Sequence, residues 1–204
     1  MFFAQPNLTV VFGVIVLTSA LSAGPQRQAQ PAPKPGVNST AQIQADFQKR
    51  VEAYESLHRK LQATLPKLPK DATPQDIDRD QRAMEQLIVH ARPDAKPGDI
   101  FTPGMQTFVR ALLADVFKGP RGAQAKAAVL DERHPVKPAI NTRYPDEVPL
   151  STMPPRVLAN LPKVPDEIEY RFVNDDLILM DVHAHIILDY VLNAMPAFPK
   201  SAPR

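Results

Sequence analysis

The residues best suited to chemistry are Asp181, His183 and His185, which alternate along the segment Asp181–His185. In a β-strand, residues two apart project from one face, roughly 6.5–7 Å from one to the next. In a helix the two histidines would diverge. Two imidazoles on one strand face can bind one metal ion beside a carboxylate. The spacing therefore allows two interpretations: an exposed polar sheet face with Arg171 paired to Asp181, which we favour, and a metal site at Asp181, His183 and His185.

The same five residues resemble the Asp-x-His-x-His segment of the amidohydrolase superfamily. In that superfamily the segment ends the first strand of a large (β/α)₈ barrel, whose later strands bring further ligands. Here it stands close to the end of the sequence, with no barrel pattern after it. We therefore exclude the amidohydrolase interpretation. The other histidines, His58, His90 and His134, could supply a third ligand only through folding, and His58 lies on an apolar stripe that predicts a core position.

A carboxy-terminal hairpin is expected to carry this polar row. Residues 168–172 alternate apolar and charged side chains, which is typical of a half-buried strand. Along 177–192 one parity is apolar without a break, which predicts one long strand. A three-residue loop at 174–176 would place Phe172 opposite Ile178 and Tyr170 opposite Met180 on the buried face. A two-residue loop would oppose apolar to polar side chains, so we predict the longer loop.

Three or four short helices are predicted before the hairpin. Between residues 40 and 65, apolar positions recur at spacings of four and three. This stripe predicts either a helix packed on its own domain or a coiled-coil surface, and we favour the former because Tyr54 and His58 suit a coiled coil poorly. Thr73-Pro74 and Thr102-Pro103 are helix start signals, and a fourth helix is expected over 123–132. The stripe consists of Ile43, Phe47, Val51, Tyr54, His58, Leu61 and Leu65.

Composition excludes several functions. The 204 residues include 23 prolines and no cysteine, with a net charge of +2. Without cysteine there are no disulfides, thiolate metal sites or cysteine nucleophiles. No Gly-rich phosphate loop occurs, and the mixture of positive and negative charges does not indicate a basic surface for nucleic acid. Eight prolines between residues 133 and 166 predict an extended connector with one short turn near 155–160.

The amino terminus has the features of an export signal. Residues 8–23 form an uncharged apolar run, followed by small residues that fit a cleavage site. The run is short for a membrane span, which needs about 20 residues. We therefore expect a signal peptide, or an uncleaved anchor, over 1–24. A Pro-rich disordered tether over 25–39, a single domain over 40–195 and a flexible tail over 196–204 follow.

Two stretches of the chain are similar to an uncharacterised family of exported bacterial proteins. One is ARPDAKPGDIFTP at residues 91–103. The other comprises 153–155, 161–165, 169–173 and 177–184. The resemblance spans roughly residues 74 to 192. It implies a leader followed by helices and then a hairpin, and it implies no catalytic role for any residue.

These observations predict an α+β protein that is exported to the periplasm or beyond. We expect a non-enzymatic binding or interaction module, with an unknown protein or envelope partner and no cofactor. Nucleic acid is not an expected partner, and membrane contact is expected only through an uncleaved amino-terminal segment. The alternative function is a metal-binding protein or metal-dependent hydrolase that uses Asp181, His183 and His185.

Overall fold

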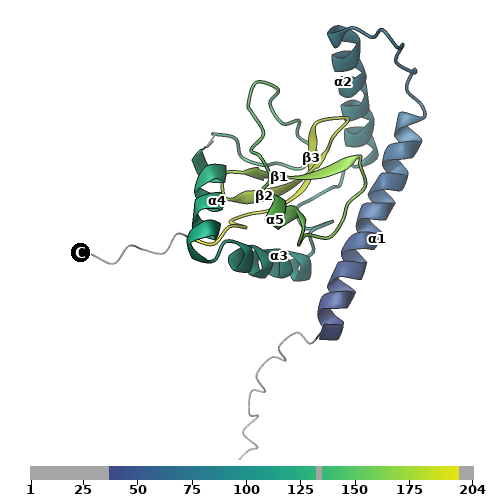
Figure 1. Cartoon of the computed structure of the whole chain (residues 1–204). Coiled ribbons are helices and arrows are strands. Elements are labelled where there is room, and N and C mark those ends of the chain that lie inside the picture. The colour runs from purple at the N-terminus through teal and green to yellow at the C-terminus, as the bar shows by residue number, and fades with distance from the viewer. Residues whose placement is uncertain (1–36, 132–134, 198–204) are drawn as a thin grey trace, which may run out of the picture. The chain divides into compact units, whose positions relative to one another are not determined.

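The computed structural model describes residues 37–131 and 135–197. The predicted signal peptide, most of the predicted tether, His134 and most of the predicted tail lie outside these residues. Five helices precede a three-stranded sheet in the described part (Figure 1). The helices are α1 (Val37–Gln62), α2 (Pro74–Ala91), α3 (Pro103–Val116), α4 (Gly119–Asp131) and α5 (Pro155–Leu158), and the strands are β1 (Ile168–Val173), β2 (Asp176–Asp181) and β3 (Ile186–Val191).

The predicted α+β class, with helices packed on a carboxy-terminal antiparallel sheet, is confirmed. Two details differ. The predicted long strand over 177–192 is wrong, because residues 182–185 form a turn that separates β2 from β3. The sheet is consequently a meander in the order β1-β2-β3 rather than a hairpin. The first helix, Val37–Gln62, begins and ends three residues before the predicted range of 40–65.

The predicted hairpin register is wrong by one residue. A two-residue turn joins β1 to β2, and Phe172 pairs with Leu177, Tyr170 with Leu179 and Ile168 with Asp181. Asn174 makes this turn with a positive φ of 55°, which asparagine tolerates better than most residues. The slip exchanges the two faces of β2, so that Leu177, Leu179 and Asp181 point toward the helices.

Both faces of the sheet are covered. This explains why the alternation of apolar side chains gave the wrong register. One face joins the main core under the helices and contains Tyr170, Leu179 and Leu188. The other face, with Ile178, Met180 and Ile187, packs beneath the Pro-rich connector through Tyr144. The connector also adds a bridge between Arg143 and Ile186 at the free edge of β3. A strand buried on both faces carries apolar side chains at both parities.

Helix α1 packs on its own domain, as the sequence favoured. Its stripe residues Phe47, Val51, Tyr54 and His58 are buried. Phe47 stacks on Phe101, with ring centroids 5.6 Å apart. The remaining stripe residues Ile43, Leu61 and Leu65 are partly buried against the same core. The apolar face of α1 is therefore used within the domain.

The helix starts follow the predicted signals with one exception. Thr73 and Asp76 form a reciprocal capping box at α2, and Pro103 occupies the first turn of α3. The fourth helix, expected from residue 123, begins four residues earlier at Gly119, which has a positive φ of 70°. That conformation, which glycine adopts readily, lets the chain change direction between α3 and α4 (Figure 1).

A buried carboxylate fixes the loop before α3. Asp189 is fully buried on β3 and accepts hydrogen bonds from four backbone N–H groups: those of Gly98 (3.0 Å), Ile100 (2.7 Å) and Phe101 (2.7 Å) in the loop, and that of the neighbouring Tyr190 (2.8 Å). A charged acceptor makes such bonds stronger than neutral ones. We call this arrangement the Asp189 clasp. It ties residues 98–101 to the sheet and positions Phe101 against α1.

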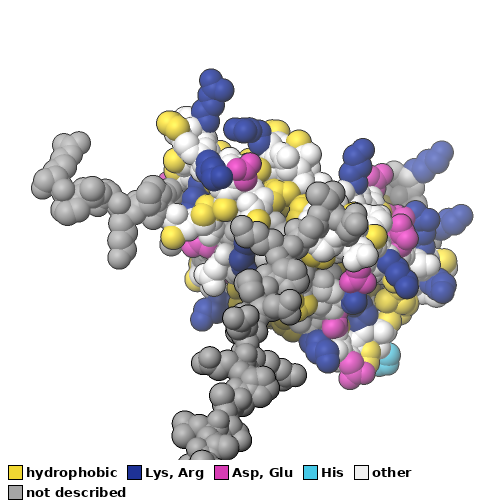
Figure 2. All heavy atoms as spheres, turned by 90° about the horizontal axis from the view of Figure 1, so that it is seen from below, with side chains coloured by type: hydrophobic (Ala, Val, Ile, Leu, Met, Phe, Trp, Pro, Cys, Tyr) yellow, Lys and Arg dark blue, Asp and Glu magenta, His cyan; other side chains and the backbone are white. Residues whose placement is uncertain are grey.

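The surface has mixed character. On the face shown in Figure 2, Lys and Arg side chains lie among Asp and Glu side chains, with apolar atoms between them. Among the described residues, no helix combines the length and apolar character needed to cross a membrane.

Candidate functional site

Three elements that are distant in sequence bring five ionisable side chains together. Helix α1 supplies Tyr54 and His58, helix α2 supplies Asp80, and the end of β2 with its following turn supplies Asp181 and His183. We call these five residues the imidazole–carboxylate cluster.

Asp181 is the centre of the cluster and has no solvent exposure. Its Oδ2 atom accepts hydrogen bonds from the Tyr54 hydroxyl and from His58 Nδ1, both at 2.6 Å. Its Oδ1 atom accepts the backbone N–H of Ala184 at 2.7 Å. Burying a carboxylate is costly unless it is paired and hydrogen-bonded, and here all three donors are supplied by the protein.

These contacts determine the charge states of Asp181 and Tyr54. Burial alone would raise the pKa of Asp181, but the hydrogen bonds from His58, Ala184 and Tyr54 outweigh it and hold that pKa below its ordinary value. Burial and the neighbouring Asp181 charge raise the pKa of Tyr54, so its hydroxyl stays protonated and remains a donor. The guanidinium of Arg92 lies 5.3 Å from the centroid of the Tyr54 ring and partly offsets this effect.

His183 forms a second imidazole–carboxylate pair. Its Nε2 atom lies 2.6 Å from Asp80 Oδ2, and the two side chains are 19% and 13% exposed. The rings of His58 and His183 are neighbours, with centroids 5.8 Å apart and planes tilted by 58°. The remaining ring nitrogens, His58 Nε2 and His183 Nδ1, are buried and have no hydrogen-bond partner. Each imidazole is thus oriented by a carboxylate through one nitrogen and has the other nitrogen free.

The turn at 182–185 places His183 within the cluster. The Asp181 carboxylate stabilises the turn by accepting a hydrogen bond from the Ala184 N–H, as aspartate often does in turns. Arg143 donates to the Ala184 carbonyl at 2.9 Å from the connector side. His185 adopts a positive φ of 55° at the end of the turn. The turn therefore directs His183 and His185 toward different surroundings.

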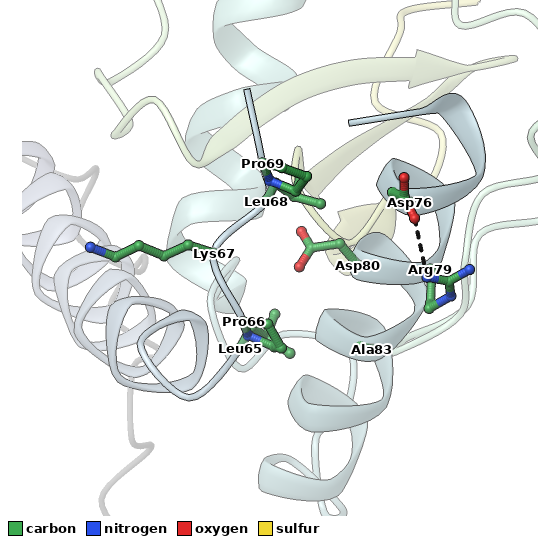
Figure 3. A pocket seen from close by; sticks show the side chains of 9 residues that line it. All are labelled: Leu65, Pro66, Lys67, Leu68, Pro69, Asp76, Arg79, Asp80 and Ala83. Carbon is green, nitrogen blue, oxygen red and sulfur yellow. Dashed lines mark hydrogen bonds and ion pairs between the residues drawn. The ribbon is translucent and has the colours of Figure 1, made fainter. Parts of the chain in front are cut away.

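Two hollows flank the segment of residues 65–69, beside Asp80. One has a volume of about 340 Å³ and lies between this segment and α2. Figure 3 shows that the Asp80 carboxylate points toward the segment, whereas Lys67 extends away from it. The other hollow, of about 560 Å³, extends toward the end of α1. Both are lined by Leu65, Pro66, Lys67, Leu68 and Asp80; His183, Arg59 and Gln62 also line the larger one.

The structure places the three sequence-predicted metal ligands differently from the predicted row. Asp181 is used by Tyr54 and His58, and His183 pairs with Asp80. His185 Nδ1 lies 3.7 Å from Asp146 on the connector. The predicted geometry of the row was wrong because residues 182–185 form a turn where a strand was expected. Within the described ranges, no group of three or more His, Cys, Asp or Glu side chains is placed to hold a metal ion. Metal binding by Asp181, His183 and His185 stays a prediction.

Sequence reasoning missed the roles of Tyr54, His58 and Asp80. His58 is 123 residues from Asp181, so no local spacing connects them. One signal was present: Tyr54 and His58 occupy successive positions of an apolar helix stripe, where polar atoms require buried partners. That signal predicts a buried acceptor without identifying it.

The fold and the site together define an α+β domain with a buried imidazole–carboxylate cluster beneath two surface hollows. Comparison with known proteins adds no relative: no protein-family model, no curated protein and no solved structure matches the chain. The similarity to an uncharacterised exported family therefore stays a prediction.

Proposed function

We propose that this chain is an exported, non-enzymatic binding protein that takes a small ligand in the hollows beside residues 65–69. The observation that carries the proposal is the lining of these hollows, which combines apolar side chains with separated charges next to a buried polar cluster. Pockets of a few hundred Å³ with this mixture are typical of small-molecule sites. Export itself rests on the amino-terminal sequence pattern.

The chemistry of the cluster supports binding over catalysis. A general base has to come within hydrogen-bonding reach of its substrate. Asp181 and His58 are enclosed, and the free nitrogens of His58 and His183 are buried. The other nitrogen of each ring is engaged by a carboxylate, so neither histidine is hydrogen-bonded to a serine or threonine hydroxyl. This arrangement lacks the nucleophile–base contact of covalent hydrolases.

The charges around the hollows indicate the class of ligand. Asp80 points toward the 65–69 segment and would attract an ammonium group. Lys67 and Arg59 lie at the larger hollow and would attract a carboxylate. Leu65 and Leu68 offer apolar surface between them, and Leu68 is 42% exposed. A short zwitterionic peptide with apolar side chains, such as a dipeptide, complements all three features.

A titration with dileucine peptide tests the proposal. Isotope-labelled protein is titrated with Leu-Leu and with its N-acetyl and C-amide derivatives, each of which lacks one terminal charge. We expect saturable shifts at Leu65, Leu68 and His183 with Leu-Leu, and at least fivefold weaker binding of each derivative. Equal binding of all three compounds, or no saturable shift with any of them, would contradict the proposal.

Matched lysine variants locate the site. Lys67→Ala removes a charge that lines both hollows, and Lys70→Ala removes an exposed charge that lines neither. We expect weaker Leu-Leu binding only in the first variant. An equal loss in both variants would show a general charge effect rather than a site.

A further inference from the structure

Two buried ring nitrogens are left without partners inside the imidazole–carboxylate cluster. They are His58 Nε2 and His183 Nδ1. The His58 side chain is 1% exposed, so bulk water does not reach it. Buried polar atoms in folded proteins are nearly always hydrogen-bonded or bound to an ion. Two orphaned atoms on adjacent rings therefore indicate a shared ligand.

The surroundings of both rings favour a metal ion as that ligand. Histidines that bind metals usually donate their other ring N–H to a carboxylate, which fixes the tautomer and the ring orientation. His58 Nδ1 lies 2.6 Å from Asp181, and His183 Nε2 lies 2.6 Å from Asp80. Both rings thus carry the outer carboxylate that such ligands require, and both present a lone pair on the opposite nitrogen.

The spacing of the rings fits one ion. With Zn–N bonds of about 2.1 Å, an ion lies about 3 Å from each ring centroid, so two rings that share it have centroids about 5–6 Å apart. The measured separation is 5.8 Å. His183 also lines the larger hollow, which gives an ion an entry path that His58 alone would not offer.

From these observations we propose that His58 Nε2 and His183 Nδ1 together bind one late first-row transition-metal ion, for which Zn²⁺ is the probe. Imidazole nitrogens suit Zn, Cu and Ni and do not suit Mg²⁺. With two protein ligands, water completes the coordination of the ion. This site differs from the sequence-predicted row, because it uses His58 and leaves out His185. It also does not depend on peptide binding.

Zinc titration calorimetry on the untagged protein tests the site. We expect one Zn²⁺ per chain and no saturable heat with Mg²⁺. His58→Leu and His183→Leu should each lower Zn²⁺ affinity at least tenfold. His185→Ala and His90→Ala, which change histidines outside the proposed pair, should leave the affinity within twofold. Loss of binding in His185→Ala would instead support the sequence-predicted row and overturn this proposal.

Nitrogen-15 spectra of the imidazoles in the wild-type protein provide a readout that needs no variant. Before zinc, His58 should carry its proton on Nδ1 and His183 on Nε2. Zinc should then shift His58 Nε2 and His183 Nδ1 together, in a one-to-one titration. Zinc shifts confined to other histidines, or no saturable binding at all, would overturn the proposal even where His58→Leu fails to fold. Because no peptide is present, a negative result leaves the dileucine experiment independent.

Discussion

The two fully buried aspartates of the sheet solve the same electrostatic problem in different ways. Asp189 receives its hydrogen bonds from backbone N–H groups alone, those of Gly98, Ile100, Phe101 and the neighbouring Tyr190. Asp181 receives two of its three from the side chains of Tyr54 and His58. The first carboxylate holds a loop in place, and the second organises titratable side chains.

This difference in donors determines which of the two carboxylates can be replaced. Backbone donors remain whatever residue replaces Asp189, so an apolar residue at this position leaves them without an acceptor. Side-chain donors can be removed together with their acceptor, and a buried ionic group is often exchanged for apolar residues at little or no cost. We infer that the Asp189 clasp serves folding, whereas the imidazole–carboxylate cluster is retained for binding.

The largest expected effect is on the Asp189 clasp. Asp189→Ala leaves two or three buried N–H groups without an acceptor, and each costs about 1–3 kcal/mol. We expect the free energy of unfolding in urea to fall by about 3–5 kcal/mol. Asp189→Asn keeps one acceptor oxygen and should lose less. A loss below about 1 kcal/mol in the alanine variant would show that the clasp does not hold the loop.

A somewhat smaller loss is expected at the cluster. Asp181→Leu strands the Tyr54 hydroxyl, the His58 Nδ1–H and the Ala184 N–H, and should cost about 2–4 kcal/mol. Urea unfolding of this variant beside Asp189→Ala compares the two aspartates directly. A Zn²⁺ titration of Asp189→Asn should retain binding, whereas Asp181→Leu should weaken it. The reverse pattern would exchange the roles that we assign.

Acid pH should remove the stability that the Asp181 carboxylate contributes to the folded protein. The pKa of Asp181 is lowered in the folded protein, so its contribution to stability is present above the unfolded value of about 3.9 and is lost as pH falls below it. The stability difference between wild type and Asp181→Asn should therefore shrink below about pH 4. Urea unfolding at several pH values measures this difference.

Asp176 is the matched control for that pH series. Burial raises the pKa of Asp176, so its contribution is lost as pH rises rather than as it falls. The difference between wild type and Asp176→Asn should consequently change with pH in the opposite sense. The same trend in both variants would indicate a general effect of net charge.

The smallest stability effect is expected at the hollows. Leu68 is 42% exposed, so Leu68→Ala should change the free energy of unfolding by no more than about 0.5 kcal/mol. It should nevertheless weaken dileucine binding severalfold. A large loss of stability would mean that the 65–69 segment is part of the folding core rather than a binding surface.

The fold class could be predicted from the sequence because single residues mark where helices begin. Thr73-Pro74 and Thr102-Pro103 mark helix starts through local chemistry, and both helices begin there. The register of β2 could not be read, because Ile178 and Leu179 point to opposite faces and both are buried. The turn at 182–185 was hidden because Val182 and Ala184 continue the apolar parity of the preceding strand.

The site was predictable only in part. Asp181 and His183 were singled out by type and spacing, and the structure places both in the cluster. Their partners His58 and Asp80 lie 123 and 103 residues away in sequence. Such pairings depend on tertiary packing of α1 and α2 against the sheet, which local patterns do not encode. His185 was grouped with them by alternation, and the turn separates it.

The buried centre of the cluster, formed by Tyr54, His58 and Asp181, should be replaceable by apolar residues without loss of the fold. The most direct test is the free energy of unfolding of Tyr54→Phe/His58→Leu/Asp181→Leu, measured in urea beside the Asp181→Leu single variant. We predict that the triple variant recovers to within about 2 kcal/mol of wild type, the remaining cost coming from the Ala184 N–H. A triple variant as unstable as the single variant, or less stable, would show instead that these three residues are needed for the fold.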